Sequence, residues 1–176
     1  MTPSIARTQL TADYSIPKII NGGWQLATGH ALAHALDMKD AHNAFAELLD
    51  RGFDTFDCAD IYTGVEAFYG QIIAERRRAG LSLPQIHTKF VPDLKDLAHV
   101  DRAYVERVIE RSLSRLGVER LDMVQFHWWD FEVPGMMETA FDLVKLQKKG
   151  KIRNIGMCNM DTQALKQMVD VGIPVV

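Results

Sequence analysis

Four side chains of this 176-residue chain could together deliver a proton to an oxygen atom: Asp57, Tyr62, Lys89 and His127. A tyrosine has an ordinary pKa of about 10 and is a poor acid at neutral pH, but a nearby ammonium group favours the phenolate and lowers that pKa. A carboxylate paired with the lysine keeps the lysine charged and oriented. A neutral histidine can donate a hydrogen bond to a carbonyl oxygen. This set suits the reduction of a carbonyl group by hydride, in which negative charge develops on that oxygen.

Short strands that alternate with helices must position these side chains. Asp57, Lys89 and His127 each stand at the end of a short, mostly apolar run, and Tyr62 lies in the loop after the first of them. Repeated alternation of strands and helices indicates parallel strands with right-handed crossovers. The carboxyl ends of parallel strands meet on one rim of the sheet. We therefore expect the four side chains to lie on the same rim.

The strand–helix unit occurs five times, and a sixth strand follows it. The helices are predicted from apolar residues at helical spacing and from glycines at their stop positions. The fifth strand delivers Cys158 and Asn159 to the same rim. Residues 1–16 are expected to be irregular, and residues 25–37 to form a loop. The expected strands are 18–21, 55–57, 85–89, 121–127, 152–157 and 173–176, and the expected helices are 38–51, 65–79, 101–117, 134–149 and 161–171.

Composition and charge speak against several classes of protein. The net charge is −3 without a long basic run, so nucleic-acid binding is not expected. No stretch approaches the roughly 18 apolar residues of a membrane span, and the first residues do not resemble a signal peptide. The two cysteines, Cys58 and Cys158, suit a reducing cytosol, so we expect a cytoplasmic protein. His30 and His34 have a metal-like spacing, but without a third ligand nearby we expect no metal.

Three motifs in the same order resemble the aldo-keto reductase family. The strongest is 52–62, followed by Glu66, which is similar to the family's signature of glycine, aromatic residue, aspartate, alanine and tyrosine. Residues 121–128 resemble the family's histidine strand, and residues 150–159 resemble its fifth-strand signature. The resemblance covers about 19–176, which is nearly the whole chain.

The resemblance implies a catalytic role for each of the four rim residues. Tyr62 would be the proton donor, and Lys89 would lower its pKa. Asp57 would pair with Lys89, and His127 would orient the carbonyl group of a small-molecule substrate. The reaction would reduce an aldehyde or a ketone to an alcohol, with the hydride supplied by NADPH.

The resemblance also implies which residues contact NADP(H). Cys158 and Asn159 would contact the nicotinamide carboxamide, and Asp57 would belong to the same site. The family usually has serine where Cys158 stands, so that hydrogen bond is expected to be weaker. Gly23 and Trp24 would lie at the mouth shared by cofactor and substrate.

The substrate pocket would be formed by Trp24, His127 and Trp128. The family fold is a (β/α)₈ TIM barrel, and a typical barrel needs about 250 residues. We therefore expect residues 1–176 to form a single aldo-keto reductase domain that is truncated at the start of strand six and incomplete at its C-terminus.

Each of these residues also has a purely structural interpretation. Tyr62 could be a packed aromatic residue, Lys89 a solvated strand end and His127 a core histidine. Asn159 could be a turn or cap residue, and Trp128 could belong to the core. Two other functions stay open: a non-catalytic or truncated nucleotide-binding or regulatory member of the same fold, and a TIM-barrel lyase or isomerase without a nicotinamide.

Overall fold

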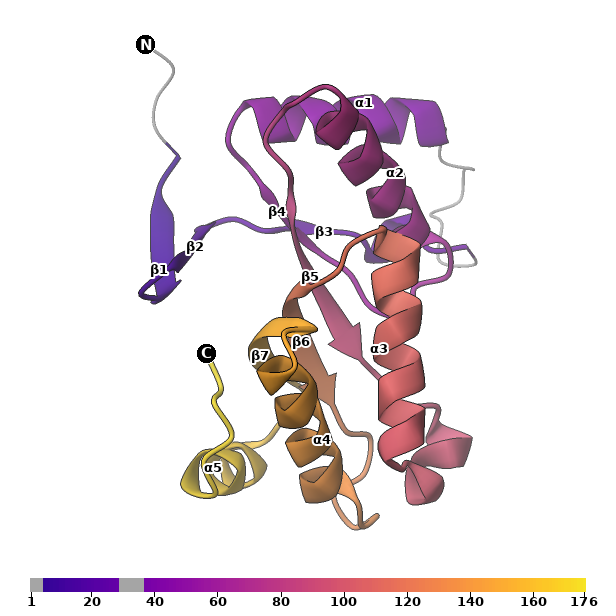
Figure 1. The fold of residues 1–176 in the computed structure, drawn as a ribbon, viewed down its shortest axis with the longest axis vertical. Coiled ribbons are helices and arrows are strands. Elements are labelled where there is room, and N and C mark those ends of the chain that lie inside the picture. Colours follow the sequence, from indigo (N-terminus) through magenta and orange to yellow (C-terminus); the bar gives the residue numbers. More distant parts are fainter. Residues whose placement is uncertain (1–4, 29–36) are drawn as a thin grey trace.

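The computed structural model describes residues 5–28 and 37–176 (Figure 1). Strands and helices alternate from residue 21 onward, after an N-terminal pair of strands. The strands are β1 (Arg7–Thr11), β2 (Tyr14–Pro17), β3 (Asn21–Gly22), β4 (Thr55–Asp57), β5 (Gln85–Phe90), β6 (Leu121–His127) and β7 (Ile152–Cys158). The α-helices are α1 (Met38–Asp50), α2 (Val65–Arg78), α3 (Arg102–Leu116), α4 (Met136–Lys148) and α5 (Thr162–Asp170), and the 3-10 helices are η1 (Trp24–Leu26) and η2 (Leu94–His99).

Five strands form one parallel sheet, in the order β3-β4-β5-β6-β7, which is also their order in the chain. One α-helix lies between each strand and the next, from α1 between β3 and β4 to α4 between β6 and β7. The predicted alternation and the parallel pairing of the strands are therefore confirmed. All carboxyl ends of these strands point to the same rim, which is where the candidate residues stand.

Helix α3 shows how local sequence sets the ends and the buried face of a helix. Asp101 caps its first turn, because the carboxylate accepts a hydrogen bond from the Tyr104 N–H at 2.8 Å. Gly117 ends it with a φ of +65°, a left-handed conformation that glycine adopts without strain. Val105 and Val108 are buried on the apolar side. These features all confirm what the sequence predicts for this helix.

Alternation along β5 separates a core face of the sheet from the face that carries the site. Ile86, Thr88 and Phe90 are buried, and the Thr88 hydroxyl donates to the Glu66 carboxylate of α2 at 2.8 Å. Lys89 lies between them in sequence and so points to the opposite face, since successive side chains of a strand alternate. The helix-covered face therefore packs in the core, and the opposite face carries Lys89 and the other candidate residues.

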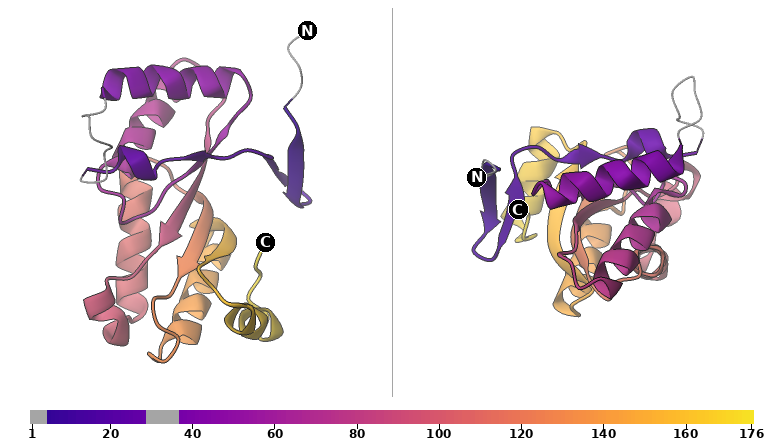
Figure 2. Two further views of the ribbon diagram at one scale, coloured as in Figure 1. Left: turned by 180° about the vertical axis from the view of Figure 1, so that it is seen from behind. Right: turned by 90° about the horizontal axis from the view of Figure 1, so that it is seen from above.

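Residues 7–17 form a β-hairpin, so the expectation of irregular structure was wrong for this part of the N-terminal segment. β1 and β2 pair antiparallel and stand to one side of the helices (Figure 2). Distant contacts hold them there. Tyr14 Oη and His87 Nε2 of β5 share a hydrogen bond of 2.9 Å, and Arg153 of β7 donates to the Asp13 carbonyl at 2.6 Å. Contacts with residues so distant in the chain leave no pattern in the sequence of the hairpin itself. For this reason its two strands were not predicted.

The edges of the sheet differ from the prediction in two places. The strand expected at 18–21 is reduced to β3, because the Lys18 N–H bonds to the Ala6 carbonyl at 2.9 Å and so belongs to the hairpin. The strand expected at 173–176 is a single parallel bridge between Ile155 and Val175. Elsewhere the predicted strands and helices agree with the structure to within one or two residues at most ends.

The loop expected at 25–37 is described only in part. It begins within η1, and His30 and His34 lie outside the described residues. In the described ranges 5–28 and 37–176, no group of three or more His, Cys, Asp or Glu side chains could hold a metal ion. In the same ranges, the helices are too short or too polar to cross a membrane.

Candidate active site

A charged pair at the ends of β4 and β5 forms the centre of the site. Lys89 Nζ lies 2.5 Å from Asp57 Oδ1 and donates a further hydrogen bond to the Cys58 carbonyl at 2.8 Å. The Lys89 side chain is 11% exposed and that of Asp57 is 29% exposed. Charges that are this far withdrawn from water need partners, because burying one without a partner is costly. The expected ion pair between Asp57 and Lys89 is therefore present, while its catalytic role stays a prediction.

Tyr62 stands in a tight loop between β4 and α2. Its N–H donates to the Ala59 carbonyl at 3.0 Å, and its carbonyl accepts from the Val65 N–H at 3.1 Å. Lys89 Nζ lies 5.1 Å from the centre of the Tyr62 ring. Burial raises the pKa of Tyr62, and the charge of Lys89 opposes that rise. Lys89 acts in the expected direction, but the net shift of the pKa is upward, so the phenol keeps its proton at neutral pH.

His127, at the end of β6, carries a buried polar atom with no partner. The residue is 5% exposed, and its Nε2 has no hydrogen-bond partner among the described residues. The Trp129 ring stands edge-on to the imidazole, and the centres of the two rings are 4.3 Å apart. Burial lowers the pKa of His127, and the charge of Lys89 lowers it further, so the ring is neutral at neutral pH. Because buried polar groups are normally satisfied, this nitrogen is well suited to bind an oxygen atom of a ligand.

Gln125 is a residue of the site that sequence reasoning missed. It lies opposite Lys89 in the register of β5 and β6, and its Nε2 donates to Asp57 Oδ1 at 3.2 Å. Asp57 is therefore held from two strands rather than one. The available signal was alternation, since Gln125 stands two residues before His127 and so shares its face of the sheet.

Cys158 and Asn159 follow β7 onto the same rim. Cys158 lies opposite His127 in the strand register and is half-buried. Burial raises the pKa of its thiol, and the charge of Lys89 opposes that rise. Asn159 is exposed and has a φ of +54°, a left-handed conformation that asparagine tolerates better than most residues. The turn interpretation of Asn159 therefore fits its backbone, and its side-chain amide is open to a ligand as well.

Gly23 is explained by packing inside the protein. A β-carbon on Gly23 would lie 2.5 Å from Tyr69 Oη and 2.7 Å from the Asp57 carbonyl oxygen, and both distances are too short. The absence of a side chain thus lets the segment before Trp24 lie against β4 and α2. Trp24 itself is 48% exposed at the start of η1, next to the Asp57 end of the sheet.

Trp128 does not fit the substrate-pocket role expected for it. It is 1% exposed, and its indole N–H donates to the Val133 carbonyl at 3.1 Å within the core. Trp129 is the exposed neighbour, at 47%, and its indole N–H donates to the Pro92 carbonyl at 2.7 Å. The two tryptophans follow His127 on opposite sides of the backbone, so Trp128 packs in the core and Trp129 is the exposed one of the two.

The arrangement can protonate an oxygen atom bound between Tyr62 and His127. In such a step the Tyr62 phenol would supply the proton, and the Lys89 ammonium beside it would stabilise the phenolate that is left behind. Asp57 pairs with that ammonium, and Gln125 of β6 donates to Asp57 and so helps to hold it in place. The neutral imidazole of His127 would supply a second polar contact for the same oxygen.

The Aldo/keto reductase family model matches residues 18–176 of the chain. The aldo-keto reductase YhdN of Bacillus subtilis is 31% identical over 167 residues, which cover 92% of this chain and 48% of that protein. The crystal structure of an aldo/keto reductase from Klebsiella pneumoniae in complex with NADP and acetate is 29% identical, with a TM-score of 0.69, and the match covers 88% of this chain and 50% of that one.

The overall fold is also similar to that of a thermostable aldo-keto reductase in complex with the inhibitor epalrestat. The TM-score is 0.78 at 25% identity, and the match covers 98% of this chain and 61% of that structure. These structures have the TIM-barrel fold, so the parallel sheet of this chain corresponds to part of such a barrel, as expected. The five strands form an open sheet. The chain spans about half the length of the curated relatives it matches.

Proposed function

The chain belongs to the aldo/keto reductase family, and on this premise we propose that it reduces an aldehyde or a ketone to an alcohol with NADPH, using Tyr62 as the proton donor. One observation carries the proposal. The Lys89 ammonium lies between the Asp57 carboxylate, 2.5 Å away, and the Tyr62 ring, whose centre is 5.1 Å away. A lysine held in this way has a clear use where a phenol must lose its proton.

Four residues of the chain have separate roles at the substrate oxygen. The Tyr62 hydroxyl donates its proton to the oxygen of the carbonyl group as negative charge develops there, and the new O–H bond replaces the phenolic one. Lys89 stabilises the resulting phenolate, and Asp57 keeps Lys89 oriented. His127 Nε2, which has no partner in the described residues, holds the same oxygen in line. NADPH, when bound, supplies the hydride that adds to the carbonyl carbon.

The donors of the rim fit a nicotinamide carboxamide, which needs both a donor and an acceptor. The Asn159 amide is exposed and offers both, and the half-buried Cys158 thiol beside it offers a weaker pair. Trp24 is the exposed aromatic side chain at the far end of the rim. The similar structure from Klebsiella pneumoniae, which is in complex with NADP, supports this choice of cofactor. We propose that Asn159, Cys158 and Trp24 face the cofactor and that Trp129 rather than Trp128 lines the substrate pocket.

The test combines cofactor binding with turnover. NADPH is titrated into the purified protein and followed by nicotinamide fluorescence, and turnover is measured with an aromatic aldehyde. The variant is Tyr62→Phe and the matched control is Tyr104→Phe, on α3. We expect saturable binding in all three proteins. Turnover should fall at least about 100-fold in Tyr62→Phe alone, the usual size of a general-acid contribution.

Other outcomes would redirect the proposal. NADPH binding without turnover in the unsubstituted protein would favour the alternative, a nucleotide-binding or regulatory member of the family. Turnover that survives in Tyr62→Phe would remove Tyr62 from the role of proton donor. A folded protein that does not bind NADPH would contradict the assignment of Asn159, Cys158 and Trp24.

A further inference from the structure

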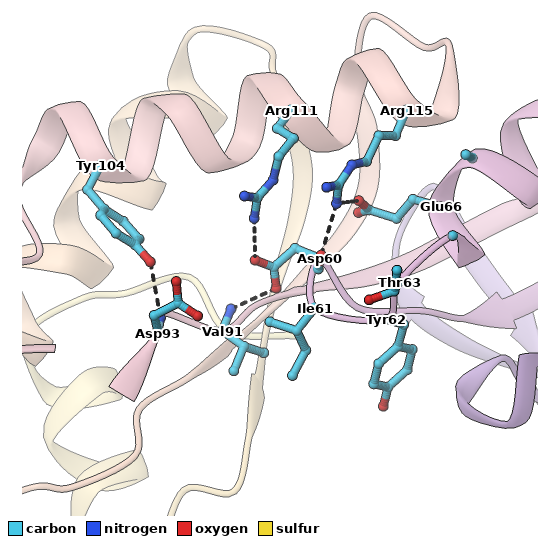
Figure 3. Close-up of a pocket in the computed structure, with 12 residues that line it drawn as sticks. Asp60, Ile61, Tyr62, Thr63, Glu66, Val91, Asp93, Tyr104, Arg111 and Arg115 are labelled. Carbon is cyan, nitrogen blue, oxygen red and sulfur yellow. Dashed lines mark hydrogen bonds and ion pairs between the residues drawn. The ribbon is translucent and has the colours of Figure 1, made fainter. Parts of the chain in front are cut away.

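Two buried carboxylates and two partly exposed arginines form an ion network behind the loop that carries Tyr62 (Figure 3). The side chains of Asp60 and Glu66 are each 1% exposed. Two arginines of α3 reach them: Arg111 Nη2 lies 3.1 Å from Asp60 Oδ2, and Arg115 Nη1 lies 3.2 Å from Glu66 Oε2. The sequence analysis did not predict that these four residues lie together. Because buried charges need close partners, the network fixes the loop against α3.

Asp60 joins three elements through its side chain and its backbone. Its carboxylate accepts from the Val91 N–H, just after β5, at 3.0 Å, in addition to its contact with Arg111. Its own N–H donates to the Lys89 carbonyl at 3.3 Å. Its carbonyl accepts from Arg115 Nη1 at 3.0 Å. Asp60 thus connects the Tyr62 loop to α3 and to the strand that carries Lys89.

We propose that Asp60 is a positioning residue for Tyr62: its carboxylate ties the Tyr62 loop to α3 and to the end of β5, and so holds the phenol beside the Lys89 ammonium. This inference rests on the proposed function, since it assigns a task to the site described above. The Tyr62 side chain points away from the ion network (Figure 3), and Lys89 Nζ lies 5.1 Å from the centre of its ring. Asp60 therefore acts through two residues of backbone and does not touch the substrate.

The groups around Asp60 explain why its charge matters to this tie. Burial raises the pKa of Asp60 to about 7, and Glu66 of α2 adds to the rise. The Val91 N–H and the two arginines of α3, Arg111 and Arg115, act in the opposite direction. Only the ionised carboxylate forms a charge pair with Arg111. Asp60→Asn keeps the shape of the side chain and an acceptor for the Val91 N–H, but it removes that pair.

A matched control is available on the same helix. Glu106 of α3 pairs with Arg102 at 3.0 Å, and its side chain is 38% exposed. Glu106→Gln therefore removes a carboxylate from an arginine of α3, as Asp60→Asn does, but at the surface and away from the Tyr62 loop. Asp60→Ala removes both the charge and the acceptor, and should have a larger effect than Asp60→Asn if the tie to Val91 contributes.

The first readout does not depend on turnover. The protein is labelled with 3-fluorotyrosine, and the ¹⁹F resonance of Tyr62 is assigned from its loss in Tyr62→Phe. We expect the titration midpoint of the Tyr62 phenol to shift in Asp60→Asn and to shift further in Asp60→Ala, because a displaced phenol changes both its distance from the Lys89 charge and its burial. Glu106→Gln should leave it unchanged.

The second readout is steady-state kinetics with NADPH and an aromatic aldehyde. We expect kcat to fall about 10-fold in Asp60→Asn with an unchanged KM for NADPH, because small displacements of a catalytic group are costly to the rate. A folded Asp60→Asn protein with a lower melting temperature but an unchanged Tyr62 midpoint and unchanged kcat would overturn the inference, since Asp60 would then only stabilise the fold.

Two further outcomes are also decisive. If Asp60→Asn does not fold, Arg111→Gln takes its place, and a shifted Tyr62 midpoint supports the tie while an unchanged one overturns it. If the unsubstituted protein shows no turnover, the proposed function fails, but the Tyr62 midpoint still tests the positioning. A shift in Asp60→Asn would then support the tie, and an unchanged midpoint would overturn it.

Discussion

Two buried histidines stand at opposite ends of the same sheet, and they have opposite surroundings. His87, in the amino-terminal half of β5, and His127, at the carboxyl end of β6, are each 5% exposed. His87 Nε2 shares a hydrogen bond of 2.9 Å with the Tyr14 hydroxyl. His127 Nε2 has no partner among the described residues. The two histidines are equally buried, but only His87 has a hydrogen-bond partner for its Nε2. This difference separates a structural histidine from one that is available to a ligand.

The two ends of the sheet differ in the same way as their histidines. At the amino end, the β1–β2 hairpin ties Arg7 to Asp54 at 3.0 Å and receives the Gln85 amide on the Ser15 carbonyl at 3.1 Å. These contacts give hydrogen-bond partners to the side chains of Asp54 and Gln85 at that end. At the carboxyl end, the polar groups of the rim are held in place but keep bonding capacity. The fold thus pairs the polar groups at one end of the sheet and leaves those at the other end able to bind a ligand.

Replacing Lys89 should give the largest effect on the carboxyl end. Lys89→Met removes the charge beside Tyr62 and leaves Asp57 without its ion pair. We expect kcat to fall by about 100-fold to 1,000-fold, the range seen when one charge-stabilising group is removed from an active site. Steady-state turnover of an aromatic aldehyde measures this. Lys166→Met, at an exposed pair on α5, is the control and should keep full turnover. A fully active Lys89→Met would show that the charged pair serves only the fold.

His127→Gln should lower turnover with little effect on stability. We expect kcat to fall about 100-fold, because the substrate oxygen loses a preorganised contact. The free energy of unfolding should change by less than about 1 kcal/mol, since no protein partner of Nε2 is lost. Urea unfolding and steady-state kinetics on the same sample measure both quantities. A large loss of stability with normal turnover would place His127 among the structural histidines.

His87→Leu should have the reverse effect. It leaves the buried Tyr14 hydroxyl without its partner, and we expect the free energy of unfolding to fall by about 1–3 kcal/mol while kcat stays within about twofold. The double variant with Tyr14→Phe should recover part of the loss, because both polar partners are then removed together. The contrast between the two ends breaks down if His87→Leu abolishes turnover in a protein of normal stability.

Acid should weaken the amino end through His87. Burial lowers the pKa of His87 from 6.5 to about 4. Between these values the unfolded chain binds a proton that the folded protein excludes, so stability falls as the pH drops, by up to about 1.4 kcal/mol per pH unit. Asp60 and His127, whose pKa values are also shifted, add to the pH dependence of stability. Comparing the unsubstituted protein with His87→Leu isolates the contribution of His87. The destabilisation caused by His87→Leu should shrink between pH 6.5 and pH 4, as measured by urea unfolding. A constant difference would contradict this assignment of charge.

Features that depend on neighbouring residues were predictable from the sequence. Helix α3 shows its cap, its apolar stripe and its terminal glycine within one stretch of chain, and the structure confirms all three. Asp57, Lys89 and His127 were placed on one rim because each stands at the end of an apolar strand and parallel strands end together. Trp128 and Trp129 could not be told apart in this way, because which of two adjacent residues is buried depends on what packs above the strand end.

The sequence by itself determined the alternation of strands and helices, the rim that carries Tyr62 and Lys89, and the family. Only the tertiary structure decided which polar groups are satisfied. Tyr14 and His87 are 73 residues apart, and Asp60 and Arg111 are 51 apart. Contacts at such separations arise when helices and strands pack, and they follow no period in the chain. For this reason the strand ends could be predicted, whereas the paired polar groups of the amino end and the ion network behind Tyr62 could not.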